Sequence, residues 1–127
     1  MRSNYQISKS EREIMEVLWK YQGFVRTKEL FDKMNSYGKD WKRQTLNTLL
    51  NRLEEKKIVK RKHAYAEAAL SETELLQAQT QQMLDIFYAG DYVNFVAVLT
   101  KNTQIDNETK LMLDNLLNHL KMNAKLS

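Results

Sequence analysis

Hydrophobic residues recur every three or four positions along most of this chain, which is the spacing of amphipathic helices. The first such run carries two overlapping capping boxes, Ser8-x-x-Glu11 and Ser10-x-x-Glu13, which predict where a helix begins. The apolar face that follows consists of Ile14, Val17, Leu18 and Tyr21. Gly23 is the expected end, because glycine readily adopts the left-handed conformation that often terminates a helix.

Two further helices are expected, separated from the first by a small strand at residues 24–26. Thr27 is the expected N-cap of the second helix, which should end within residues 35–38. The third helix is expected to begin at about residues 40–42 and to run to about Lys57. Its apolar stripe consists of Leu46, Leu49, Leu50 and Leu53.

Residues 58–70 alternate between apolar and polar positions and predict an antiparallel hairpin with Ile58, Tyr65 and Leu70 facing inward. The hairpin lacks the Asn-Gly or Asp-Gly pair that favours a tight turn, so we expect an unusual turn or a short tip. The alanine-rich segment 64–69 is also compatible with a helix.

The second half of the chain predicts helices only. A third capping box, Ser71-x-x-Glu74, begins a long helix that is expected to end at Gly90. The remaining elements are expected to be a short helix at residues 92–99, a loop at 102–107 and a last helix at 108–122.

Basic residues concentrate in the first half of the chain. Residues 1–70 carry 16 Lys and Arg against 9 Asp and Glu, whereas residues 71–127 carry 4 against 7. A basic first half suits binding to a polyanion. An acidic second half that contains leucine and methionine suits contact with protein.

Composition disfavours several classes of function. The chain has no cysteine, which excludes disulfides, thiol catalysis and thiolate metal sites, and we interpret His63 and His119 as surface residues. No glycine-rich phosphate loop or nucleophile elbow is present, so we expect no enzyme activity, metal or cofactor. No apolar run approaches the ~20 residues that cross a bilayer, and the first residues, MRSNYQISKSERE, contain no apolar region of the kind that a secretory signal carries. The protein is therefore expected to be soluble and cytoplasmic, without membrane contact.

The predicted third helix presents a polar face opposite its leucines. Gln44, Thr48 and Asn51 point away from the leucine stripe, flanked by Thr45, Asn47 and Arg52. Most of these side chains donate and accept hydrogen bonds, as the reading of base edges in a major groove requires, and Lys42 and Arg43 add positive charge. An ordinary solvated helix surface has the same composition and is the alternative for this face taken alone.

The order of the predicted elements favours a DNA-binding function for this face. Short helices followed by a basic hairpin, which carries Lys60, Arg61 and Lys62, are the layout of a winged helix-turn-helix module. The sequence therefore predicts a mainly α fold with a small β-hairpin. We expect residues 1–70 to form a winged helix-turn-helix DNA-binding domain and residues 71–127 to form a helical dimerisation segment.

Three segments carry a family resemblance: ISKSEREIMEVLW, KDWKRQTLNTLLNRLEEKKIVKRK and the strand that ends at Leu70-Ser71-Glu72. Over nearly the whole chain the sequence resembles the penicillinase-repressor family of bacterial transcriptional regulators, the BlaI/MecI/CopY group. The resemblance implies a winged-helix homodimer that occupies a near-palindromic operator in double-stranded DNA and blocks transcription until a signal removes it. The residues expected to contact DNA are Lys42, Arg43, Gln44, Thr45, Asn47, Thr48, Arg52, Lys60, Arg61 and Lys62. Trp41 is interpreted as a packing residue between helix and hairpin.

The second half contains more apolar positions than so small a segment buries alone, which predicts a homodimer interface. Its expected residues are Leu84, Phe87, Val96, Leu99, Leu111, Leu116 and Leu120. For the antibiotic-responsive branch, the resemblance implies that a sensor-coupled protease cuts an Asn-Phe bond, and Asn94-Phe95 occupies the corresponding place. A packed aromatic residue beside a polar neighbour is the alternative interpretation of this pair.

Two other functions stay open at the level of the sequence. The copper-responsive branch of the family carries paired cysteines near the C-terminus, and this sequence has none, so a copper-responsive repressor would lack that tail. A winged-helix module that docks on a partner protein is the other alternative. Binding of any DNA duplex at moderate salt would discriminate against it.

Overall fold

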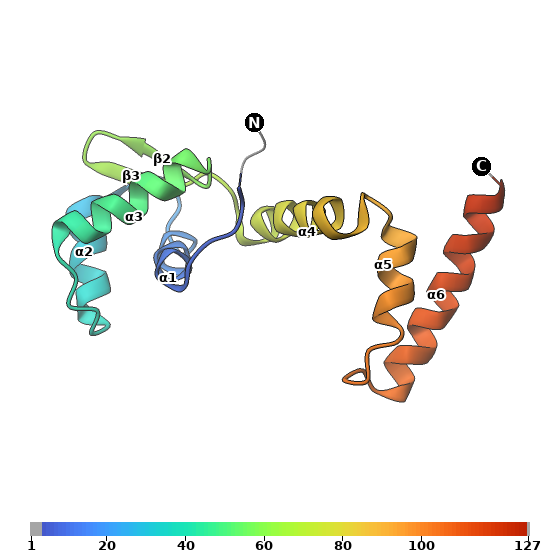
Figure 1. Ribbon diagram of the computed structural model, residues 1–127. Coiled ribbons are helices and arrows are strands. Elements are labelled where there is room, and N and C mark those ends of the chain that lie inside the picture. Colours follow the sequence, from blue (N-terminus) through green and yellow to red (C-terminus); the bar gives the residue numbers. More distant parts are fainter. Residues whose placement is uncertain (1–3, 127) are drawn as a thin grey trace. The chain divides into compact units, whose positions relative to one another are not determined.

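The computed structural model describes residues 4–126, with side chains described through residue 124. It is mostly helical with a small antiparallel sheet, which confirms the predicted fold class (Figure 1). The elements are α1 (Lys9–Leu18), β1 (Val25–Arg26), α2 (Thr27–Ser36), α3 (Arg43–Glu55), β2 (Val59–Lys62), β3 (Tyr65–Ala68), α4 (Glu72–Tyr88), α5 (Tyr92–Leu99) and α6 (Asn107–Leu126). The chain forms two compact units, which divide within α4 between Gln79 and Thr80.

The first predicted capping box begins α1. The Ser8 hydroxyl accepts a hydrogen bond from the Glu11 amide at 3.1 Å, and the Glu11 carboxylate accepts one from the Ser8 amide at 3.2 Å. The second predicted box is wrong, because Ser10 already lies inside the helix. The predicted end at Gly23 is also wrong: α1 ends at Leu18. The next residue, Trp19, donates its indole N–H to the carbonyl of Leu70 at 2.9 Å, and the chain turns there toward β1.

The junction of β1 and α2 differs from the prediction in one detail. The strand runs directly into the helix, so the extended backbone of Arg26 occupies the N-cap position, and no side chain caps this end. Thr27, which was predicted as the cap, is the first helical residue. Its amide donates to the carbonyl of Ala64 at 2.8 Å, which joins the start of α2 to the hairpin loop.

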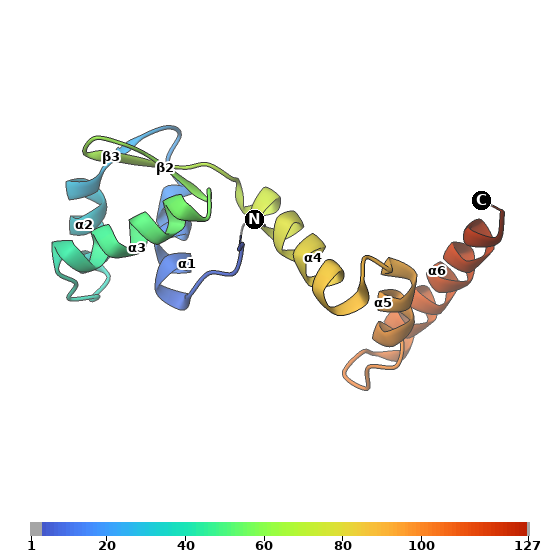
Figure 2. The same ribbon diagram turned by 45° about the horizontal axis from the view of Figure 1, so that its top comes forward.

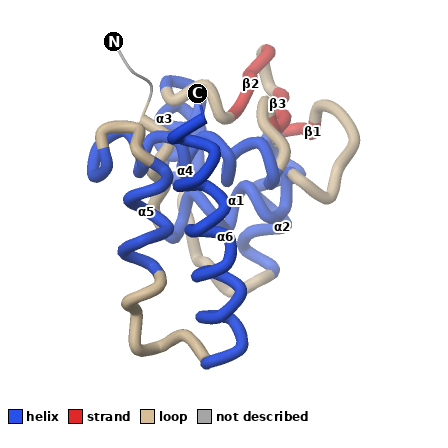
Figure 3. The backbone as a smooth tube through the Cα atoms, turned by 90° about the vertical axis from the view of Figure 1, so that its right-hand side faces the viewer, coloured by secondary structure: helices blue, strands red, loops and turns tan. Residues whose placement is uncertain are grey.

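The sheet has the order β1-β3-β2, with all neighbours antiparallel (Figure 3). The predicted hairpin is confirmed, and the helical alternative for residues 64–69 is wrong. Strands β2 and β3 are joined by a two-residue turn in which His63 has a positive φ of 55°, an uncommon conformation for a residue other than glycine. Ile58 is buried as predicted, whereas Tyr65 and Leu70 are only half-buried. The buried residues of the hairpin strands β2 and β3 are Val59 and Ala66, and Val25 is buried in β1.

A single apolar core holds the first unit together and fixes the orientation of α3. The core consists of Ile14, Met15, Val17, Leu18, Val25, Leu30, Met34, Leu46, Leu49, Leu50, Leu53, Ile58, Val59, Ala66 and Leu75. The four leucines of α3 are all at most 8 % exposed, which confirms the predicted apolar stripe. Trp41 packs against this core, and its backbone amide donates to the Asn35 side chain at 2.9 Å, so the turn before α3 is anchored to α2.

The second unit consists of the end of α4 together with α5 and α6. Helix α4 ends at Tyr88, after which Ala89 and Gly90 both have left-handed backbone conformations, with φ of 50° and 78°. The amide of Gly90 donates to the carbonyl of Leu84 at 3.0 Å. Helices α5 and α6 lie side by side and run in opposite directions (Figure 1). Their buried apolar residues are Val96 and Leu117. The predicted bounds of α5 are confirmed, and α6 is longer at its C-terminal end than expected.

Candidate nucleic-acid interface

The polar face of α3 lies on the surface of the first unit. Gln44, Thr45, Asn47, Thr48, Asn51 and Arg52 are all exposed, as are Lys42 and Arg43 at the start of the helix. The leucine stripe turns this face outward, because burial of four leucines fixes the rotation of the helix about its axis. The Thr48 hydroxyl donates to the backbone carbonyl of Gln44 at 2.9 Å and keeps acceptor capacity for an outside donor.

A shallow hollow of about 340 Å³ runs along one flank of this face. The hollow is lined by Lys42, Gln44, Thr45, Thr48, Leu49 and Arg52. The amide and hydroxyl groups of Gln44, Thr45 and Thr48 lie in the middle of the hollow. The cations Lys42 and Arg52 lie on either side of them along the helix. This combination allows hydrogen bonds to base edges between two phosphate contacts.

The hairpin is tied to α3 through Arg61. Strand β2 lies next to α3 (Figure 2), and the Arg61 guanidinium donates to the side-chain Oδ1 of Asn51 at 2.7 Å and to the side-chain Oδ1 of Asn47 at 3.3 Å. Arg61 is therefore half-buried, whereas Lys60 and Lys62 beside it are exposed. Sequence reasoning placed Arg61 on the hairpin for DNA contact and gave no indication of these hydrogen bonds.

A second hollow, of about 450 Å³, lies on the other flank of α3, between the start of α2 and the tip of the hairpin. Its lining residues are Arg26, Thr27, Lys28, Arg43, Asn47, Ala64 and Tyr65. Arg26 donates from Nε to the Tyr65 hydroxyl at 3.2 Å. Arg26 and Lys28 were missed by sequence reasoning, because only the fold brings the β1–α2 junction beside α3. The two basic residues in the segment VRTK were a weak local signal.

A buried ion pair supports the far end of α3. Lys56 Nζ lies 2.9 Å from Glu11 Oε2 and donates to the carbonyl of Gln6 at 2.8 Å, so it joins the end of α3 to the start of α1. Burial by itself raises the pKa of Glu11, but other interactions act in the opposite direction. Hydrogen bonds from Lys56 and from the amide and hydroxyl of Ser8, together with the charge of Lys56, outweigh burial and hold this pKa below its ordinary value.

The Asn94–Phe95 bond lies inside α5. The Asn94 side chain is exposed, and its backbone amide donates to the capping carboxylate of Asp91 at 3.0 Å. Phe95 packs edge-to-face on Tyr88, with ring centroids 5.3 Å apart. This contact supports the packing interpretation of Phe95 and does not test whether the bond is ever cut.

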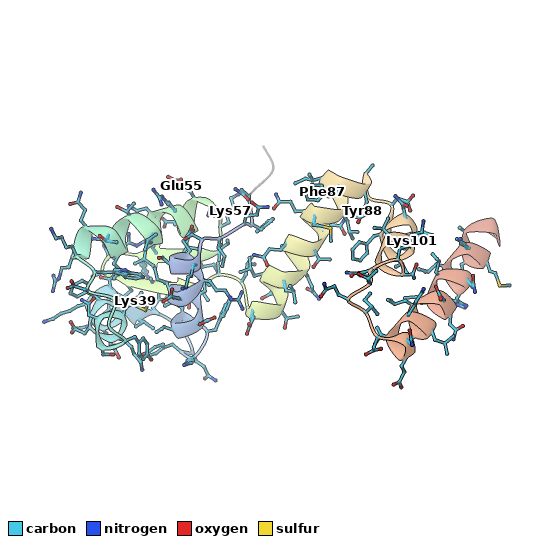
Figure 4. The ribbon with its side chains drawn as sticks, turned by 60° about the horizontal axis from the view of Figure 1, so that its bottom comes forward. Lys39, Glu55, Lys57, Phe87, Tyr88 and Lys101 are labelled. Atoms are coloured by element: carbon cyan, nitrogen blue, oxygen red, sulfur yellow. The ribbon has the colours of Figure 1, made fainter. Side chains whose placement is uncertain are left out.

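The predicted dimerisation residues differ in exposure. Phe87, Leu111 and Leu116 are 73 %, 62 % and 44 % exposed, whereas Leu84, Leu99 and Leu120 are half-buried and Val96 is buried. Other large apolar residues of this unit are exposed as well, namely Ile86, Tyr92, Val98, Met112 and Met122. Figure 4 shows Phe87 and Tyr88 at the end of α4.

Other kinds of site find no support in the part of the chain that the structure describes. Among residues 4–126, no helix combines the length and the apolar character needed to cross a bilayer. Within the same range, no group of three or more His, Cys, Asp or Glu side chains is placed to hold a metal ion.

Helices α1–α3 with the β2–β3 hairpin have the arrangement of a winged helix-turn-helix module. The sequence model of the family described as Penicillinase repressor matches residues 7–119, and the chain therefore belongs to the penicillinase repressor family. The penicillinase repressor of Staphylococcus aureus is 25 % identical over 119 residues, which cover 91 % of this chain and 93 % of that protein. The penicillinase repressor of Bacillus licheniformis is 27 % identical over 108 residues, covering 81 % and 82 %. Membership supports a role as a DNA-binding transcriptional repressor.

Proposed function

We propose that this protein represses transcription by binding a near-palindromic operator as a homodimer, with α3 of each copy in the major groove. The observation that carries the proposal is the exposed polar face of α3, which lies opposite a buried leucine stripe and beside a hollow flanked by cations. Its composition suits base edges and phosphates together.

The exposed residues divide into two roles. Gln44, Thr45 and Thr48 read the sequence, because their amide and hydroxyl groups lie in the first two turns of α3, from which a recognition helix reaches base edges. The phosphate contacts are assigned to the exposed residues Lys42, Arg43, Lys60 and Lys62, and to the half-buried Arg61. These contacts set affinity and register without reading sequence.

A second copy covers the apolar surface of the second unit. Phe87, Leu111 and Leu116 lie exposed on the same unit, and burial of such residues is worth roughly 1.5–3 kcal/mol for each complete side chain. A two-fold axis would then place two recognition helices for half-sites about one helical turn, ~34–36 Å, apart. Affinity for the operator depends on this pairing, since each head raises the effective concentration of the other.

Release would follow from proteolysis of the Asn94–Phe95 bond by a sensor-coupled protease. The bond lies within helical backbone, so α5 must open locally before a protease can bind it in an extended form. A cut there would separate α6 from the DNA-binding unit and remove part of the apolar surface that the dimer needs. Incubation with a partner protease, followed by mass spectrometry of the fragments, tests this step.

The assignment of Gln44 tests the proposed reading face. Replacing Gln44 with Ala is expected to lower the ratio of operator to random-DNA affinity about 5- to 150-fold, since a good bidentate base contact is worth ~1–3 kcal/mol. Gln77→Ala is the matched control, because Gln77 is an exposed helical glutamine in α4 and lines neither hollow. An equal loss on both duplexes would show that Gln44 does not read sequence.

A further inference from the structure

We propose that Arg26, Lys28 and Arg43 form a second phosphate site, which holds the DNA backbone on the hairpin side of α3. The inference rests on the proposed function and extends it to residues outside the recognition helix and the hairpin strands. It predicts that the β1–α2 junction is part of the DNA-binding surface.

The site is a concave space with walls from three parts of the chain. The β1–α2 junction contributes Arg26 and Lys28, α3 contributes Arg43 and Asn47, and the hairpin tip contributes Tyr65. At about 450 Å³, the hollow is large enough for a phosphate group with its bound water. The bond from the amide of Thr27 to the carbonyl of Ala64 joins two of these walls, the β1–α2 junction and the hairpin tip.

All the charged side chains that line the hollow are positive. Three of its lining residues are cations, and no Asp or Glu is among them. None of these cations is in an ion pair among the residues that the structure describes. An anion that enters the hollow therefore has no resident carboxylate to displace.

Both guanidinium groups are held in place before any ligand arrives. The Arg26 guanidinium lies 5.8 Å from the centroid of the Tyr65 ring and bonds to its hydroxyl, and the Arg43 guanidinium lies 5.7 Å from the centroid of the Phe31 ring. Arginine presents a planar fork of donors that matches phosphate oxygens. Ordering beforehand reduces the entropy lost on binding.

The position of the hollow identifies the anion as backbone phosphate. Helix α3 forms a ridge between two hollows: Gln44 and Thr48 face one of them, and Arg43 and Asn47 face the other. A helix seated in a major groove has one sugar-phosphate backbone on each side. Lys42 and Arg52 would then meet one strand, and the three cations of the second hollow would meet the other.

The test compares Lys28→Gln with Lys20→Gln. Lys28 is exposed and lines the hollow, whereas Lys20 is an exposed lysine of the same unit that lines neither hollow. Binding of the full chain to its own upstream DNA and to a scrambled duplex is measured across salt concentrations. Each phosphate contact contributes about 0.9 to the slope of log K against log salt, so a dimer that loses two contacts should have a slope shallower by ~1.8.

The expected result is a shallower slope for Lys28→Gln and an equal loss of affinity on both duplexes, with Lys20→Gln indistinguishable from wild type. Ethylation interference should lose one phosphate position per half-site in Lys28→Gln and Arg26→Gln. If wild type binds its upstream DNA selectively but Lys28→Gln keeps the wild-type slope and interference pattern, the second phosphate site is wrong and the proposed function stands. If wild type shows no selectivity, the proposed function itself fails.

Discussion

Replacing Lys56 with Met should destabilise the first unit by about 2–3 kcal/mol at neutral pH. Removal of one partner from a buried ion pair typically costs about 3–5 kcal/mol, because the other charge stays buried without a partner. The expected cost is smaller here for two reasons. The Lys56 side chain is 20 % exposed, so solvent already screens part of the attraction, and Glu11 keeps its hydrogen bonds from Ser8.

The destabilisation should depend on pH with a definite sign. In the wild type, the pKa of Glu11 is held below its ordinary value, so the ion pair stabilises the fold above the unfolded pKa. This contribution is lost as the pH falls through the lowered folded pKa. Without Lys56, two of the causes that lower the pKa of Glu11 are lost, so this pKa rises and the carboxylate contributes less stability at neutral pH. The difference between the proteins should be largest at neutral pH and should shrink in acid.

Urea unfolding at neutral and acid pH measures this difference. Both tryptophans, Trp19 and Trp41, lie in the first unit, so their fluorescence reports unfolding of that unit. Lys57→Met is the matched control, since Lys57 is exposed at the end of α3 (Figure 4). Adding Glu11→Gln to Lys56→Met should restore stability by removing the unpaired charge. A loss below about 0.5 kcal/mol, or one that does not change with pH, would refute the reasoning.

Two further predictions concern the hairpin and the second unit. Arg61→Ala should lower stability by about 1–2 kcal/mol through loss of its charged hydrogen bonds, and urea unfolding of the double variant with Asn51→Ala should give a coupling energy of at least ~0.5 kcal/mol. Purely additive effects would argue that the bond is not formed in solution. We expect the wild type to sediment as a dimer and Phe87→Asp to sediment as a monomer with an unchanged circular dichroism spectrum, because this exposed side chain lies on the proposed interface. An unchanged dimer would place the interface elsewhere.

Local patterns predicted most of the secondary structure. The Ser8 and Ser71 boxes marked two helix starts correctly, because the partners in a capping box are only three residues apart. The end of α1 was not predictable in the same way. Gly23 carries the usual stop signal, yet the helix ends at Leu18, and the adjacent Trp19 bonds to Leu70, which is 51 residues away along the chain.

The candidate site likewise has one part that follows from local sequence patterns and one part that depends on tertiary packing. The exposed face of α3 follows from helical periodicity, since four buried leucines determine which residues point outward. The contact of Arg61 with Asn51 and the gathering of Arg26, Lys28 and Arg43 depend on how the hairpin and α2 pack beside α3. No spacing within one segment carries that information.

Binding of the purified protein to its own upstream DNA and to a scrambled duplex, followed by fluorescence anisotropy at several salt concentrations, tests the central claim most directly. We expect cooperative binding, with an affinity for the upstream DNA at least ~10³-fold above that for the scrambled duplex, which is the lower end of the range usual for specific DNA-binding proteins. We also expect a steep loss of affinity with salt on both duplexes. Weak binding that ignores sequence and vanishes with salt would contradict the claim that the polar face of α3 reads DNA.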